Sequence, residues 1–184
     1  MQKENSTYES YLADIYKWGM FVLIVACVCA DVVYTTMKVL GYYPTVNWWQ
    51  LLLFDCMDAL FAFLAYLQVR FSVREGRIPE RKLRQGKCFA FVALLVQWNY
   101  ILYMIPSHVF WSMLGFFCIL ICFFLDIKLL FSFGASCILS LFISWKVRGY
   151  EVYPVALQGR MDDWICCIII MCLSILGISC FLFL

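Results

Sequence analysis

Six polar residues lie within or at the edge of long apolar runs in this 184-residue sequence, and their chemistry needs an explanation. They are Asp31, Asp55, Asp58, Gln97, Asn99 and His108. Polar and ionisable groups are costly at membrane depth, so they usually face a cavity or another helix. We therefore take these six as candidate ligand-binding residues. They would bind a small cationic or hydrogen-bonding ligand, or relay protons.

The depth of these residues supports a shared site. At about 1.5 Å per residue, Asp31, Asp55 and Asp58 lie roughly 10–15 Å below the outer boundary of their spans, and Gln97 and Asn99 lie at a similar depth. Asp55 and Asp58 are three residues apart and share a helical face, whereas Gln97 and Asn99 do not. The alternative is interhelical hydrogen bonding, worth roughly 0.6–2 kcal/mol per contact. His108 has no second ligand nearby in the sequence and fits a helix boundary.

The elements that must position these residues are membrane-spanning helices. Hydrophobic residues make up 65% of the chain and charged residues 14%, and about 20 apolar residues suffice to cross a bilayer. We predict an all-α, polytopic membrane protein that is one six-helix transmembrane bundle. Its expected spans are residues 18–40, 48–71, 88–105, 107–125, 129–145 and 164–184. Asp126 and Lys128 would mark a tight turn, and five spans result if the fourth and fifth are re-entrant.

Basic residues predict the orientation, because loops rich in Lys and Arg stay in the cytoplasm. Residues 70–87 hold seven of the fourteen: Arg70, Arg74, Arg77, Arg81, Lys82, Arg84 and Lys87. With this basic loop inside, both termini are cytoplasmic as well. The mixed charges of residues 1–17, without a small-residue cleavage pattern, indicate an uncleaved signal-anchor. The basic loop could also contact anionic lipid headgroups.

The eleven cysteines do not indicate a metal or redox site. They form no Cys-x-x-Cys pair, there is one histidine, and every cysteine lies in an apolar span. Buried thiols of this kind are inert and act as small hydrophobic residues. We therefore expect no metal and no cofactor.

One region resembles a known family. The stretch QWNYILYMIPS at residues 97–107, Trp111, and FFLDIK at residues 123–128 resemble the six-helix membrane input regions of bacterial signalling proteins that carry cytoplasmic GGDEF (diguanylate cyclase) domains. The resemblance covers nearly the whole chain and implies a sensor in the bacterial plasma membrane. The sequence stops at Leu184 without the GGDEF segment, so no catalytic residue can be assigned from it.

Three functions follow as expectations. The first is a sensory or ligand-binding module that signals to a cytoplasmic output domain or partner, with the lipid bilayer around it, a homodimer as one assembly, and no nucleic acid partner. The second is a small transport component resembling the substrate-binding subunit of vitamin transporters, with Ala26 and Ala30 as a small-residue docking pair. The third, an intramembrane enzyme, is disfavoured because the chain contains no catalytic motif.

Overall fold

The computed structural model describes residues 2–73, 77–105, 109–124 and 126–148. This part of the chain contains five helices: α1 (Gln2–Val39), α2 (Trp48–Ser72), α3 (Glu80–Met104), α4 (Val109–Cys122) and α5 (Ile127–Arg148). Four helical segments are long and apolar enough to cross a membrane: Ser10–Val39, Trp48–Ser72, Glu80–Met104 and Ile127–Ser144. An all-helical fold with several apolar helices of sufficient length to cross a membrane is therefore confirmed within the described residues. The sixth expected span, residues 164–184, lies outside them.

The starts of α1 and α3 differ most from the sequence prediction, and the ends of α4 and α5 differ from the expected spans by two or three residues. α1 begins at Gln2 rather than near residue 18, and α3 begins at Glu80 rather than near residue 88. Much of the basic segment 70–87 is consequently helical, because α2 continues to Ser72 before the chain turns. Hydropathy detects the part of a helix that fits a bilayer, and polar turns that extend such a helix carry no apolar signal.

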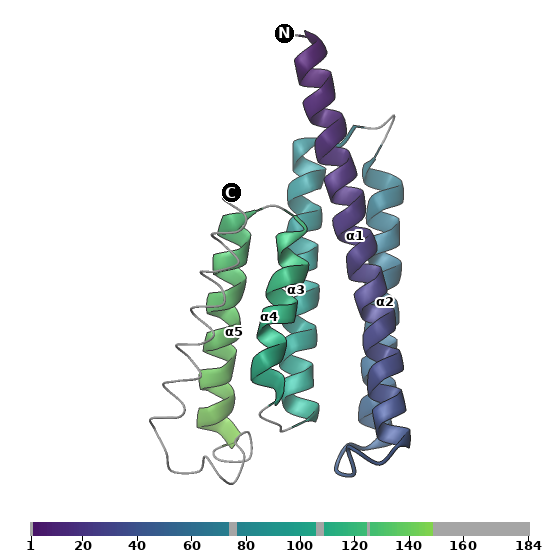
Figure 1. Cartoon of the computed structure of the whole chain (residues 1–184), viewed down its shortest axis with the longest axis vertical. Coiled ribbons are helices and arrows are strands. Elements are labelled where there is room, and N and C mark those ends of the chain that lie inside the picture. The colour runs from purple at the N-terminus through teal and green to yellow at the C-terminus, as the bar shows by residue number, and fades with distance from the viewer. Residues whose placement is uncertain (1, 74–76, 106–108, 125, 149–184) are drawn as a thin grey trace. The chain divides into compact units, whose positions relative to one another are not determined.

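The described structure divides into two compact units, with the boundary inside α3 at Ala93 and Leu94. In the first unit α1 and α2 pack against each other as an antiparallel pair (Figure 1). Buried positions follow a seven-residue repeat on both helices. They are Ala13, Tyr16, Met20, Leu23, Cys27 and Tyr34 on α1, and Leu51, Phe54, Asp58, Ala65 and Ser72 on α2. This spacing is typical of helices that cross at about 20°.

A tight turn joins α1 to α2 and keeps the two helices in register. Gly41 adopts φ 83°, which a residue with a Cβ rarely does. The backbone N–H of Gly41 donates to Lys38 O at 3.1 Å, and that of Tyr42 donates to Met37 O at 3.0 Å. These two bonds form a Schellman motif, the usual way to end a helix at a glycine. The Asn47 N–H, just before α2, donates to Gln50 Oε1 at 2.9 Å.

In the second unit, α5 follows α4 after only four residues. Asp126 caps α5, since its Oδ1 accepts a hydrogen bond from the Leu129 N–H at 3.1 Å. Aromatic rings fill the interior: Phe117 stacks on Phe133 with centroids 6.4 Å apart and meets Trp98 edge-on at 5.7 Å. The turn at Asp126 predicted from the sequence is therefore present.

Candidate functional site

Three aspartates from two helices meet in the first unit, and we call them the acidic cluster: Asp31 of α1 with Asp55 and Asp58 of α2. Asp31 lies eight residues before the end of α1, and Asp55 lies seven residues after the start of α2. Because the two helices are antiparallel and joined by a short turn, these positions reach the same level. Asp58 occupies a position in the buried repeat of α2 that an apolar residue would normally fill.

The carboxyl groups of the acidic cluster contact one another. That of Asp31 lies within hydrogen-bonding reach of both Asp55 and Asp58. The hydroxyl of Thr35, one turn after Asp31, interacts in turn with the Asp55 carboxyl. Asp58 is fully buried, with 0% of its surface exposed, whereas Asp31 and Asp55 are half-buried. The cluster thus extends from the helix interface toward the surface of the helix pair.

Within the described ranges, Asp31 and Asp55 form no ion pair with a lysine, arginine or histidine. The Oδ1 atom of each of these two aspartates is buried and has no hydrogen-bond partner within the described ranges. Buried polar atoms are normally hydrogen-bonded, and a buried charge is normally paired. Asp31 and Asp55 therefore have unused capacity to bind a proton or another positively charged group.

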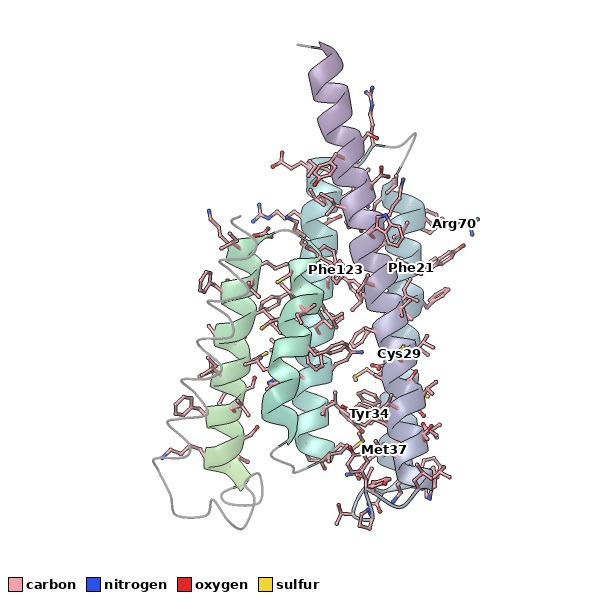
Figure 2. The ribbon with its side chains drawn as sticks, viewed as in Figure 1. Phe21, Cys29, Tyr34, Met37, Arg70 and Phe123 are labelled. Carbon is pink, nitrogen blue, oxygen red and sulfur yellow. The ribbon has the colours of Figure 1, made fainter. Side chains whose placement is uncertain are left out.

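Aromatic side chains border the acidic cluster. Tyr34, 5% exposed and labelled in Figure 2, meets the ring of Phe54 edge-on with centroids 5.4 Å apart. Its phenol also interacts electrostatically with Asp58. Carboxylates beside aromatic rings are the groups that bind organic cations in proteins.

The nearest lysine along α1 is engaged elsewhere. Lys38 Nζ donates to the backbone oxygens of Tyr43 at 2.9 Å and Pro44 at 3.4 Å. It also lies 5.8 Å from the centre of the Trp48 ring. Burial in this turn raises the pKa of the Tyr43 phenol. Lys38 therefore holds the turn between α1 and α2 together.

Of the other candidate residues, two belong to the second unit and one lies outside the described residues. Gln97 and Asn99 belong to the second unit. Gln97 is buried, with 4% of its surface exposed. Asn99 is exposed, and its amide donates to Leu95 O at 2.8 Å on its own helix. His108 lies outside the described residues, so its predicted place at the mouth of a site stays a prediction.

The close approach of carboxyl groups in the acidic cluster limits how many of them can be ionised at once. A hydrogen bond between two carboxyl groups requires that one of them carry a proton, and like charges in contact cannot all ionise. Among the described residues, no group of three or more His, Cys, Asp or Glu side chains is placed to hold a metal ion. The contacts fit a shared proton, or a cation that replaces it.

Sequence reasoning identified the three aspartates but missed Thr35 and Tyr34. Thr35 follows Asp31 by four residues and Tyr34 by three, so both face the same side of α1. This spacing was visible in the sequence and could have identified them. No protein-family model matches the chain, and neither a curated protein nor a solved structure matches it.

Proposed function

We propose that this chain is a sensory or ligand-binding module of the bacterial plasma membrane. It has six transmembrane helices and both termini in the cytoplasm. The acidic cluster binds a positively charged ligand, either a proton or a small organic cation. Binding changes the packing of α1 against α2 and is communicated to a cytoplasmic domain or partner. The observation that carries this proposal is the convergence of Asp31, Asp55 and Asp58, with no basic partner for Asp31 or Asp55 in the described part of the chain.

The structural alternative is that the three aspartates only fix the register of α1 and α2. A buried polar residue at a repeat position of paired helices does this in coiled coils, at a cost in stability. Register fixing and ligand binding differ in one measurable respect. A ligand stabilises the state that binds it increasingly as its concentration rises, whereas a register contact contributes the same free energy at every concentration of an added cation.

Thermal unfolding of the purified protein in detergent separates the two, with Asp55→Asn as the main variant. Asparagine keeps the size and hydrogen-bonding capacity of the side chain but removes its charge. For the wild type we expect the Tm to fall as the pH rises, because carboxyl groups that share a proton repel one another once all are ionised. We expect Asp55→Asn to unfold at a Tm that varies less with pH.

Added methylammonium distinguishes an organic cation from a proton. At constant pH and ionic strength, a rise in the wild-type Tm that Asp55→Asn loses would assign the site to an organic cation. A pH response without a methylammonium response would assign it to a proton. Asp14→Asn, which alters an exposed aspartate of α1, is the matched control. Equal pH and ligand responses in wild type and Asp55→Asn would refute the proposal.

A transport component is the second candidate, favoured by one observation. Ala26 and Ala30 are half-buried and one turn apart on α1, and small residues at this spacing allow a partner helix to approach closely. A transport subunit would co-purify with an ATPase partner, and its gene would neighbour ATPase genes. A sensor module would instead be found with signalling domains.

A further inference from the structure

We infer that the end of the first unit where α2 leads to α3 is a docking surface for anionic phospholipid headgroups. The surface is formed by Arg70, Arg77, Arg81, Lys82 and Arg84, which we call the basic collar. All five side chains are exposed. Figure 2 shows Arg70 pointing away from the helices.

Three side chains of the basic collar, all on α3, have uncompensated charges within the described residues. Arg81, Lys82 and Arg84 form no ion pair and no hydrogen bond to an acceptor within the described residues. The segment 70–87 contains seven basic and two acidic residues, Glu75 and Glu80. Three neighbouring cations on one helix repel one another. They are stabilised by an external anion, so the surface is complementary to negative charge.

The position of the collar selects the kind of anion. The apolar run of α3 begins at Cys88, four residues after Arg84 and seven after Arg81. At about 1.5 Å per residue these arginines lie roughly 6 and 10 Å beyond the start of the apolar segment. The headgroup region on each side of a bilayer is about 5–8 Å thick. Arg84 therefore lies at the level of lipid phosphates, and the long side chain of Arg81 can reach back to them.

Packing within the first unit fixes the direction of the collar. Tyr16 of α1 is fully buried, and its ring lies directly against the backbone of Gly86 in α3. Gly86 is two residues after Arg84, so this contact holds the start of α3 against α1. The guanidinium groups of Arg81 and Arg84, three residues apart, share one face of the helix. A guanidinium binds phosphate oxygens in a bidentate manner.

This surface is independent of the proposed ligand site. Lipid binding by the folded protein is also a different property from the influence of basic loops on orientation during membrane insertion. The test uses the full chain reconstituted in bilayers that contain trace spin-labelled lipid. Electron paramagnetic resonance then gives the relative association of labelled phosphatidylglycerol and labelled phosphatidylcholine. We expect the wild type to prefer phosphatidylglycerol at least threefold, since each basic residue near an anionic surface contributes about fivefold in affinity.

Three variants make the test specific. R81Q/K82Q/R84Q should lose the preference, and R81K/R84K should keep most of it because the charge remains. K128Q/K146Q, which removes charge from α5, should bind lipid like the wild type. The Tm of the triple variant in phosphatidylcholine alone should equal that of the wild type, which shows that it is folded.

Two results would overturn the inference. One is an unchanged phosphatidylglycerol preference in the folded triple variant. If the triple variant does not fold, R81K/R84K decides instead, because loss of the preference in that variant would contradict a surface based on charge. The other is displacement of the labelled lipid by inorganic phosphate at constant ionic strength, because the collar would then be a site for a free anion.

Discussion

At the level of single residues, the most informative side chains are those that carry charge where charge is costly. Asp58 is fully buried, and the Asp31 carboxyl lies near Asp58 and Asp55 rather than near a lysine. Lys38 lies less than two turns beyond Asp31, yet its ammonium is bound to carbonyl oxygens of the turn. The chain thus keeps its nearest cation on α1 away from the acidic cluster and leaves that cluster open to an external one.

Lys38 gives the first residue-scale prediction. In Lys38→Met the aliphatic length is retained, but the hydrogen bonds to Tyr43 O and Pro44 O are lost. Hydrogen bonds from a charged donor contribute about 1.5–3 kcal/mol, so we expect the Tm in detergent to fall by several degrees.

Lys17→Met is the control for this measurement. Lys17 pairs with Asp14 at 3.0 Å on the exposed surface of α1, where an ion pair contributes little. We expect its Tm to stay within about 1–2 °C of the wild type. Equal losses in both variants would mean that the Lys38 bonds do not hold the turn.

At the scale of the helices, one contact between α1 and α3 depends on close approach at a glycine. A Cβ built on Gly86 would overlap the ring of Tyr16, approaching its Cζ to 2.7 Å. The Tyr16 hydroxyl lies near Ser72 of α2, so this tyrosine joins all three helices of the first unit. We call this contact the Tyr16 junction.

Gly86→Ala should therefore destabilise the protein, although alanine favours helix formation. Overpacking of this kind costs about 1–3 kcal/mol. Gly115→Ala in α4 is the matched control, since nothing lies within 4 Å of its Cβ position, and it should be neutral or stabilising. We expect a lower Tm for Gly86→Ala only. A Gly86→Ala Tm equal to that of Gly115→Ala would show that α1 does not approach α3 at this glycine.

Part of this helical arrangement was predictable from the sequence. Apolar length located the spans of α1, α2, α3 and α5, and the Asp126 turn before α5 was recognised from its charges. The N-terminal extension of α1 was not predicted, because the charged residues Asp14 and Lys17 lie among the few buried positions of this segment, such as Ala13 and Tyr16. A buried repeat with few members in a segment of mixed polarity can be recognised only when the partner helix is known.

Part of the acidic cluster was predictable from the position of its residues along the two helices. Antiparallel neighbours joined by a short turn bring residues at equal distances from the turn to one level, which is why Asp31 and Asp55 could be paired. The exposure of Asn99 and the burial of Gln97 could not be assigned in the same way. The two are about 200° apart around a helix, and the sequence does not specify which side of α3 faces a partner.

For the whole molecule, the decisive property is which side of the membrane each end of the first unit faces. One end carries the basic collar. The other, at the turn between α1 and α2, carries exposed aromatic residues: Tyr42, Trp48 and Trp49. Basic residues near spans favour the cytoplasm, and tryptophan and tyrosine gather at membrane interfaces. The collar should therefore be cytoplasmic and the turn should face outward.

Thiol labelling tests this orientation with two single substitutions at exposed positions, Arg77→Cys by the collar and Tyr42→Cys in the turn. In right-side-out vesicles, a membrane-impermeant maleimide should label Tyr42→Cys and leave Arg77→Cys unlabelled until the vesicles are opened. The wild-type protein gives the background from its own eleven cysteines, which should be low because each lies within an apolar run of the sequence. Labelling of Arg77→Cys in sealed vesicles would invert the orientation. The acidic cluster, which lies nearer the turn than the collar, would then open toward the cytoplasm and respond to an internal ligand.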